Sequence, residues 1–435
     1  MADTSEKKGV KVKSTQAAKK VRSLVMGMNQ KAHTAKAEGR PVAYCMAGIS
    51  NEILLAMDIT PQWTENYAGL CAVMQQAQGF LEKAESEGYS NCICGYVRTG
   101  LGFDAMRAEM GGASPEAPDG GLVDPDMLLG LSIMCDPRFK WYQSLGRYMQ
   151  KPTYCYDVMI PPIGANPAEV DKYYVKYQVD EFKGLISFLE EQTGKKMDYD
   201  RLSEHLKITN ETYRVWWQTD QLRKAVPCPM PSTDHFNIFV PAIFMGGEPA
   251  TLQFYKELYD EIKERVDNKE GVVPEEKYRL MWAGGIPPWH TMWILNHFAN
   301  MGAVFAIEYA YRWFGDPVEI PVGPENPLEH LAWRSLKWNT LRYEEARRGS
   351  GDPMVEHLIK LANDYQIDGM VMHATRSCRA TTIGQMFLQK MVQDHVKIPS
   401  LLLVSDLIDL RDYSEAAWRS QIDSFMETVA ARKAG

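Results

Sequence analysis

The sequence contains few of the motifs that assign a function by themselves. Its 435 residues include no Gly-x-x-x-x-Gly-Lys-Ser/Thr pattern, so we predict no ATP-binding loop on this chain. They include no run of about 18 uncharged apolar residues, so we predict no membrane span. No apolar core follows the Lys-rich first residues, so we predict no secretory signal and expect a cytoplasmic protein.

Positive charge is also in short supply. The 48 Lys and Arg residues are outnumbered by 56 Asp and Glu residues, and the net charge is −8. A nucleic-acid-binding face needs an excess of Lys and Arg, so nucleic acid is not a predicted partner. A neutral or anionic ligand can still bind where positive side chains gather locally.

Cysteine is scarce, and no Cys-x-x-Cys metal motif occurs. Disulfides are rare in the cytoplasm, and an isolated cysteine there is most often a small buried hydrophobe. The eight cysteines are Cys45, Cys71, Cys92, Cys94, Cys135, Cys155, Cys228 and Cys378.

Short apolar runs alternate with helix-like stretches along most of the chain. Runs such as 127–134, 278–283 and 303–309 predict buried strands, and 353–365 predicts a helix. The alternation is typical of α/β proteins, so we predict two similar parallel-sheet units with helices on both faces. The predicted divisions are an N-terminal helical arm (1–40), a first α/β unit (41–165), a helical insert (166–230) and a second α/β unit with a C-terminal helix (231–435).

Three of the cysteines stand beside the ends of apolar runs. Cys94 follows a short apolar segment, predicted as a strand over 90–94, and precedes a glycine-punctuated turn. Cys135 and Cys378 each follow a strand-like run and precede a helix-like one. Loops at the carboxyl ends of parallel strands converge on one crevice, so we predict that these three thiols meet.

Three thiols that meet predict a metal centre. Thiolates are soft ligands that suit an iron–sulfur cluster or zinc. Three thiolates on a four-iron cluster would leave one iron open to water or substrate, as at an open catalytic metal position. Cys92 competes with Cys94 as a ligand, and Cys45 is a further thiol that could close the cluster. Arg98 and Arg379 stand beside thiols in the sequence and would offset the cluster's charge, unless they form ordinary ion pairs.

The candidate proton-transfer residues are scattered. His290 and His373 are each isolated, and they are candidates because histidine is the usual acid–base group. Glu308 ends a strand-like run and is a third candidate, although a core ion pair is the more ordinary role for such a carboxylate. The catalytic residue stays unassigned among these three.

Three stretches around the cysteines resemble the 2-hydroxyacyl-CoA dehydratase family. The resemblance runs from about residue 40 to the end, and within the family it is strongest to the ATP-dependent benzoyl-CoA reductases. The stretches are Cys94 to Gly102 (Cys-Gly-Tyr-Val-Arg-Thr-Gly-Leu-Gly), Cys135-Asp136 with Lys140-Trp141, and His373 to Cys378 with Asp406 and Asp409 downstream.

The resemblance implies a 4Fe–4S cluster on Cys94, Cys135 and Cys378. It implies reduction of the aromatic ring of benzoyl-CoA to a cyclic dienoyl-CoA by a four-subunit complex. A smaller related subunit would share the ring-reducing site. Two further subunits would hydrolyse ATP with Mg²⁺ and inject electrons taken from ferredoxin.

Three alternatives stay open at this level. The first is a subunit of a 2-hydroxyacyl-CoA dehydratase, which uses one electron catalytically to expel water. The second is a non-catalytic electron-relay subunit, whose cluster would be fully ligated with the help of Cys92 or Cys45. The third is a zinc site.

Overall fold

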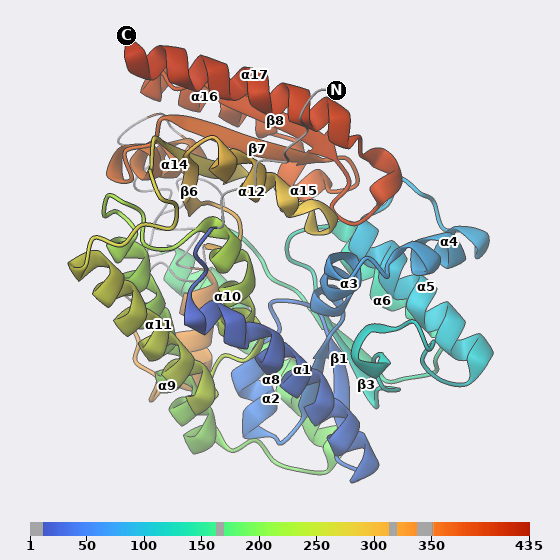
Figure 1. Cartoon of the computed structure of the whole chain (residues 1–435). Coiled ribbons are helices and arrows are strands. Elements are labelled where there is room, and N and C mark those ends of the chain that lie inside the picture. Colours follow the sequence, from blue (N-terminus) through green and yellow to red (C-terminus); the bar gives the residue numbers. More distant parts are fainter. Residues whose placement is uncertain (1–11, 162–168, 313–319, 337–349, 351) are drawn as a thin grey trace.

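The chain folds into two parallel β-sheets with helices packed on their faces (Figure 1). The computed structural model describes residues 12–161, 169–312, 320–336, 350 and 352–435. Each sheet has four strands, and every strand pair is parallel. The predicted α/β class with two similar units is therefore confirmed.

The two sheets share one topology. In each sheet the first and third strands along the chain are central, and the second and fourth lie at the edges. The first sheet has the order β2-β1-β3-β4 and contains β1 (Val42–Cys45), β2 (Thr60–Trp63), β3 (Met127–Leu131) and β4 (Thr153–Tyr156). The second has the order β6-β5-β7-β8 and contains β5 (Tyr278–Gly284), β6 (Ala303–Glu308), β7 (Gly369–Thr375) and β8 (Ser400–Ser405).

This strand order creates a crevice in each unit. After the first strand the chain moves outward to an edge, and it then returns to the other side of the first strand. The switch points therefore lie between β1 and β3 and between β5 and β7, and ligands bind at such points outside the carboxyl ends of the strands.

Helices account for most of the remaining chain. They are α1 (Gln16–Ala37), α2 (Asn51–Ala56), α3 (Thr64–Val73), α4 (Gln78–Ser86), α5 (Gly95–Met110), α6 (Asp136–Ser144), α8 (Lys176–Thr193), α9 (Tyr199–Leu222), α10 (Ser232–Phe244), α11 (Pro249–Asp267), α12 (Trp293–Asn300), α14 (Pro353–Asp364), α15 (Arg379–Thr382), α16 (Gln385–Val396) and α17 (Glu415–Ala434). Several begin at a residue whose side chain accepts a backbone N–H of the first turn, including Ser50, Asp198, Asp352 and Ser414.

Alternate residues of the second sheet pack on different helices. Met370 and Met372 of β7 join a core cluster with α14 and α16, whereas Val371 joins the cluster that includes α17. The edge-on contact between Phe298 of α12 and Phe425 places α12 beside α17. Both faces of this sheet are covered, as is usual for a parallel sheet, and Figure 1 shows α17 along the top of the unit.

Helix α1 joins the N-terminal part of the chain to the helical region. It packs along α10 and α11. The Asp234 carboxylate accepts hydrogen bonds from the Thr15 N–H at 2.6 Å and from the Ser14 hydroxyl. The Glu261 carboxylate accepts the N–H groups of Gln16 and Ala17.

Several predicted elements differ from the observed ones. The stretch predicted as one helix over 70–83 contains the end of α3 and the start of α4, because the chain turns at Gln75 with a φ of 56°. The predicted strand over 90–94 is a turn, and the short edge strand β2 was not anticipated. Helices continue past residue 230 as α10 and α11, and the predicted domain limits stay a prediction.

The glycine-punctuated turn predicted after Cys94 is instead helix α5. Its glycines serve packing, because a Cβ at Gly100 would lie 1.9 Å from Cζ2 of Trp141, and one at Gly102 would lie 1.8 Å from the Phe80 carbonyl oxygen. The absence of side chains lets α5 lie directly against α4 and α6.

Gly102→Ala is therefore expected to lower the free energy of unfolding by about 1–3 kcal/mol, because a backbone atom of α4 would have to move. Urea unfolding followed by circular dichroism measures the change. Gly27→Ala in α1 is the matched control, since nothing lies within 4 Å of its added Cβ. The control should gain up to about 1 kcal/mol from helix propensity. Equal stability changes in the two variants would contradict the packing account.

Within the described residues, none of the helices combines the length and the apolar character that crossing a membrane requires.

Candidate functional site

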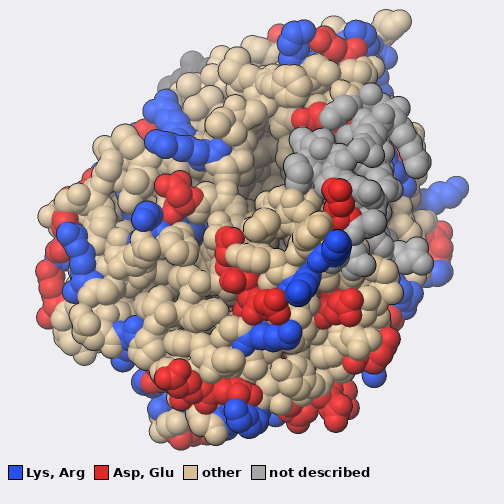
Figure 2. All heavy atoms as spheres, turned by 180° about the vertical axis from the view of Figure 1, so that it is seen from behind, with Lys and Arg blue, Asp and Glu red and all other residues tan. Residues whose placement is uncertain are grey.

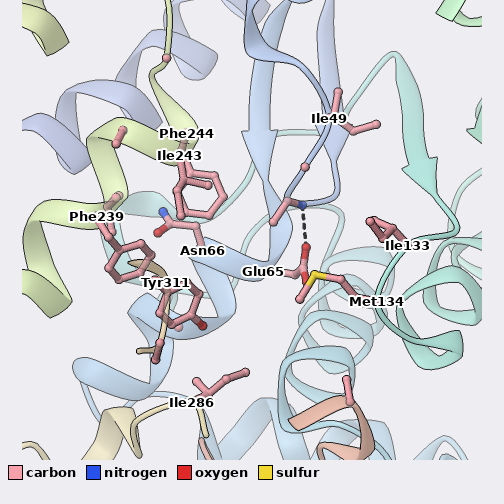
Figure 3. Close-up of a pocket in the computed structure, with 18 of the residues that line it drawn as sticks. Ile49, Glu65, Asn66, Ile133, Met134, Phe239, Ile243, Phe244, Ile286 and Tyr311 are labelled. Atoms are coloured by element: carbon pink, nitrogen blue, oxygen red, sulfur yellow. Dashed lines mark hydrogen bonds between the residues drawn. The ribbon is translucent and has the colours of Figure 1, made fainter. Parts of the chain in front are cut away.

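A cavity of about 1500 Å³ lies at the carboxyl ends of both sheets. Segments that follow β1, β3, β5, β6 and β7 all contribute to its lining, together with the N-terminal part of α5 and one face of α10. Its walls are mainly apolar and aromatic, and Figure 3 shows Ile49, Ile133, Phe239, Phe244 and Tyr311 around the space. The back of the molecule is hollowed, and mostly uncharged residues surround the hollow (Figure 2).

The structure brings Cys94, Cys135 and Cys378 to this one cavity. Each is the residue that immediately precedes a helix: Cys94 for α5, Cys135 for α6 and Cys378 for α15. Cys135 and Cys378 follow the central strands β3 and β7, as the sequence predicted. Cys94 follows a turn rather than a strand, so only two of the three stand at the carboxyl ends of strands.

The three thiols interact electrostatically. Burial raises the pKa of the Cys94 thiol well above its ordinary value, and the neighbouring Cys378 and Cys135 raise it further. The backbone N–H groups of Val97 and Tyr96, in the first turn of α5, act in the opposite direction. Burial also raises the pKa of Cys135, against the backbone N–H and the charge of Arg138. The first-turn N–H groups of a helix lack carbonyl partners within the helix, so they favour an anionic sulfur.

Aromatic residues form the wall beside two of these thiols. The rings of Phe239 and Tyr311 are stacked, with centroids 4.2 Å apart and an interplanar angle of 13°. The Trp289 indole N–H donates to the Tyr96 hydroxyl, which lies 3.2 Å from the Tyr311 hydroxyl. Cys94 and Cys378 both raise the pKa of Tyr311, which places that ring near the thiols.

Comparison with known proteins assigns the family. The family described as 2-hydroxyglutaryl-CoA dehydratase, D-component, matches residues 47–429. The chain belongs to this family. Membership alone does not decide between the activities that the family contains.

Relatives of different activity match the chain about equally well. It is 28% identical to the (R)-phenyllactyl-CoA dehydratase alpha subunit of Clostridium sporogenes, over 97% of this chain and 98% of that one. It is 29% identical to the (R)-2-hydroxyisocaproyl-CoA dehydratase alpha subunit of Clostridioides difficile, over 92% and 93%. It is 27% identical to a benzoyl-CoA reductase subunit of Thauera aromatica, the B-type one, over 96% and 95%.

The other five cysteines of this dehydratase-family chain do not line the cavity. Cys45 is buried in β1, where its thiol lies 3.7 Å from the Ala43 carbonyl oxygen. Cys92 is exposed, and its thiol donates to the Asn91 side chain. Neither competing ligand therefore faces the space that the three predicted thiols share.

Arg138 is a site residue that the sequence analysis missed. Its guanidinium is buried beside Cys135 and forms an ion pair with Glu65, with Nε and Oε1 2.7 Å apart. It also donates to the carbonyl oxygens of Ile133 and Ala47, and Glu65 in turn accepts the Ala47 N–H at 2.6 Å (Figure 3). The signal was present, since an arginine three residues after the N-cap lies one helical turn away.

The two arginines named from sequence are placed differently. Arg98 is buried, and its Nη1 donates to Asp409 at 2.9 Å and to Glu85 at 3.0 Å. It therefore takes the ordinary ion-pair role. Arg379 is exposed at the start of α15 and does not line the cavity.

The proposed proton-transfer residues lie outside the cavity lining. The His290 ring nitrogen Nε2 lies 3.1 Å from the Asp406 carbonyl oxygen. His373 contacts the Ile286 carbonyl oxygen and the Ser405 hydroxyl, and burial lowers its pKa to about 4. Glu308 is fully buried in an ion-pair network. The geometry gives none of these three residues contact with the described cavity.

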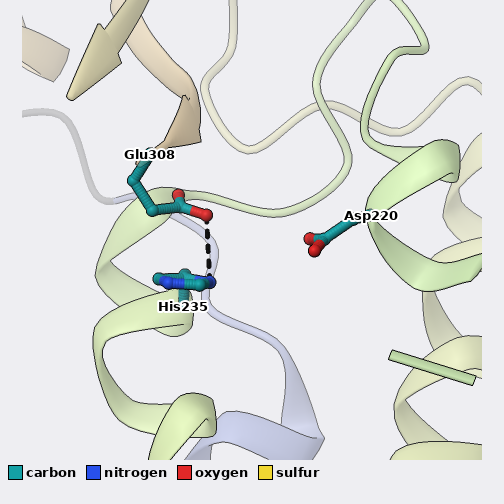
Figure 4. Close-up of side chains that lie close together, drawn as sticks. All are labelled: Asp220, His235 and Glu308. Carbon is teal, nitrogen blue, oxygen red and sulfur yellow. Dashed lines mark ion pairs between the residues drawn. The ribbon is translucent and has the colours of Figure 1, made fainter. Parts of the chain in front are cut away.

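The Glu308 network occupies what is otherwise a possible metal site. Ligand atoms of Asp220, His235 and Glu308 lie within 4.8 Å of one another (Figure 4). However, the Arg223 guanidinium donates to both Glu308 oxygens at 2.7 Å, and Arg312 pairs with Asp220 at 2.9 Å. Two arginines already neutralise the two carboxylates, so the group is a structural network of α9, α10 and β6.

Asp406 ties two of the cysteine segments together. One carboxylate oxygen accepts the N–H groups of Ile408 and Asp409, and the other accepts the Ser377 hydroxyl. Ser377 stands next to Cys378, and its oxygen accepts the N–H of Gly95, the residue after Cys94. Asp406 thereby couples the positions of both thiols.

Asp406→Ala is expected to release bound metal about 10–100-fold faster to a chelator, because residues that orient ligands have effects of that size. The measurement is the rate of iron loss from anaerobically purified protein challenged with a chelator. Asp412→Ala is the control, since Asp412 makes only an exposed ion pair with Arg376. Equal rates in both variants would show that Asp406 does not orient the ligands.

Proposed function

We propose that Cys94, Cys135 and Cys378 hold a 4Fe–4S cluster, and that this chain is a B-type subunit of an ATP-dependent benzoyl-CoA reductase. One observation carries the proposal. In a chain of this family, three remote thiols face the same end of an aromatic-walled cavity, and no other cysteine lines it in the described residues.

The residues present suit such a cluster. The thiols alone are disfavoured as anions, because burial raises the pKa values of Cys94 and Cys135. Bound iron would favour their thiolate forms, since metal ligation requires deprotonated sulfur. Helix N–H groups and the buried Arg138 would offset the remaining negative charge.

When bound, the cluster supplies low-potential electron transfer beside the cavity and an iron without a protein ligand. The chain's own residues do the remaining work. The apolar walls exclude water, which favours a strongly reducing centre. Phe239, Phe244 and Tyr311 offer flat faces for an aromatic acyl group.

The proposal includes partners. A smaller related subunit would complete the ring-reducing site, and two ATP- and Mg²⁺-binding subunits would deliver electrons from ferredoxin. The relatives are themselves named as subunits, alpha subunits among the dehydratases and a B-type subunit in the reductase, which supports membership of a multi-subunit enzyme. The reaction would convert benzoyl-CoA to a cyclic dienoyl-CoA.

The second candidate is a subunit of a 2-hydroxyacyl-CoA dehydratase. It is favoured by the dehydratase alpha subunits that match at 28% and 29% identity. A non-catalytic relay subunit is disfavoured, because the thiols adjoin a large cavity and neither Cys45 nor Cys92 lines it.

Turnover by the assembled complex tests the function. The complex is incubated anaerobically with ATP, a strong reductant and either benzoyl-CoA or (R)-phenyllactyl-CoA, and the products are identified by mass spectrometry. Stoichiometric dienoyl-CoA formation supports the reductase. Dehydration of the hydroxyacyl-CoA without ring reduction supports the second candidate. Iron and acid-labile sulfide analysis of the same sample distinguishes a cluster from zinc.

A further inference from the structure

Two residues that line the cavity have an unusual backbone conformation. Among the described residues that are not glycine, eight have a positive φ, and six of these are Asp, Gln or Lys: Asp58, Gln75, Asp119, Lys269, Gln366 and Lys397. The other two are Met134, with a φ of 84°, and Tyr311, with a φ of 62°. Both line the cavity. A bulky residue in this region is strained, and such strain is concentrated at functional sites.

The strained backbone holds the Tyr311 side chain inside the cavity. Its ring is stacked on Phe239 of α10, and Figure 3 shows it across the space from Ile133 and Met134. Ring stacking and the hydroxyl contact with Tyr96 fix the orientation of a side chain that follows β6.

A directed chain of hydrogen bonds leads to the Tyr311 hydroxyl. Trp289 can only donate, so its N–H occupies an acceptor position on the Tyr96 oxygen. The Tyr96 hydroxyl then donates to the Tyr311 oxygen across the 3.2 Å separation. This direction agrees with the pKa of Tyr311: burial raises it, and the hydrogen bond from Tyr96 opposes the rise. Successive hydrogen bonds polarise one another, so the chain strengthens Tyr311 as an onward donor.

The carboxylates and the histidine that line the cavity are held by other partners. Glu52 pairs with Arg334 at 2.8 Å, and although burial opposes it, this pairing lowers the pKa of Glu52 to about 2. Glu65 pairs with Arg138. His330 contacts the Val322 carbonyl oxygen at 2.7 Å and Asn210. Tyr311 differs from these groups because it stands beside Cys94 and Cys378, where the reacting part of a substrate would lie.

We propose that the Tyr311 hydroxyl donates a hydrogen bond to the thioester carbonyl oxygen of the bound acyl-CoA, an inference that rests on the proposed function. An electron added to an acyl group conjugated with the thioester places negative charge on this oxygen. A donor already oriented by Tyr96 and Phe239 stabilises that charge without reorganisation. The same donor serves ring reduction and hydroxyacyl-CoA dehydration, because both substrate classes carry the carbonyl group.

Tyr311→Phe tests the proposal, because it removes the hydroxyl and keeps the ring that stacks on Phe239. In the assembled complex, kcat with the accepted substrate should fall about 10²–10³-fold, while KM changes much less. Iron content should stay at the wild-type level. Tyr67→Phe is the matched control: Tyr67 is also buried and donates to the Pro118 carbonyl oxygen, but it lies outside the cavity lining. Its kcat should be unchanged.

A measurement without turnover separates this inference from the proposed function. Benzoyl-CoA and (R)-phenyllactyl-CoA with a ¹³C-labelled thioester carbonyl are bound to the complex without ATP, and the carbonyl stretch is recorded by difference infrared spectroscopy. A hydrogen bond lowers this frequency, so the bound band should move upward in Tyr311→Phe and stay in place in Tyr67→Phe.

Each outcome decides between the two ideas. A band that depends on Tyr311 for the hydroxyacyl thioester, without ring reduction, would overturn the proposed function and support the inference. An identical frequency in wild type and Tyr311→Phe would overturn the inference and leave the proposed function standing. Failure of both thioesters to bind would overturn both.

Discussion

Cys135→Ser is expected to weaken cluster retention by more than about 100-fold, because changes to residues that only orient ligands already cost about 10–100-fold. A serine hydroxyl is a poor replacement for a thiolate, since iron–sulfur clusters are held by soft sulfur ligands. Cys135 is the least buried of the three thiols, so its replacement perturbs packing least. Substrate turnover should be lost together with the iron.

Iron and acid-labile sulfide per chain, measured after anaerobic purification, provide the readout. Circular dichroism on the same sample shows whether the fold is retained. Cys92→Ser is the matched control, because Cys92 is exposed and outside the cavity lining. Cys228→Ser is a second control: its buried thiol donates to the Met230 carbonyl oxygen, and a serine hydroxyl can do the same. Full iron content in Cys135→Ser, or iron loss in either control, would contradict the ligand assignment.

Glu308→Gln is expected to lower the free energy of unfolding by about 3–5 kcal/mol, because it leaves a buried guanidinium without its main counter-charge. Arg223 donates to both Glu308 oxygens at 2.7 Å, and neither side chain is exposed. His235 lies 2.9 Å from the same carboxylate, and the Ser232 hydroxyl donates to it. No nearby water-exposed group can take over this charge within the described network.

The effect should depend on pH. Burial by itself would raise the pKa of Glu308, but Arg223 and His235 together hold it well below its ordinary value. A carboxyl whose pKa is lowered by folding stabilises the protein above its unfolded pKa, about 4.3 for glutamate, and loses this contribution as the pH falls further. The stability gap between wild type and Glu308→Gln should therefore be full at pH 7 and shrink below about pH 4.

Urea unfolding midpoints at pH 7 and at acidic pH measure this gap. Glu257→Gln is the control, because Glu257 forms an exposed ion pair with Lys20, and such pairs contribute about 0–1 kcal/mol. A loss in Glu308→Gln no larger than in this control would show that the buried network contributes little to stability.

Local sequence patterns predicted much of the fold. Uninterrupted apolar runs such as those in β3, β6 and β7 indicated strands buried on both faces, and the observed strands are wholly buried. The turn between α3 and α4 and the edge strand β2 were missed. Gln75 adopts its positive φ without a glycine signal, and β2 is a short strand, Thr-Pro-Gln-Trp, that only partly enters the core.

The site was predicted unevenly. Cys135 and Cys378 were identifiable from the strand-then-helix pattern around them, since parallel topology sends such loops to one edge of a sheet. Cys94 was named with an incorrect local structure, because Gly95, Gly100 and Gly102 suggest a turn. Close helix packing, not conformational freedom, explains Gly100 and Gly102.

The sequence by itself determined the α/β class, the two similar units and the three cysteines that share a cavity, because each of these follows from periodicity or from residue type along a short stretch. Tertiary structure alone decided which charged and aromatic groups accompany them. Arg138 and Tyr311 reach the cavity, whereas His290, His373 and Glu308 do not line it. Cavity walls are assembled from segments far apart in the chain, and the direction of a side chain depends on packing partners that no local pattern encodes.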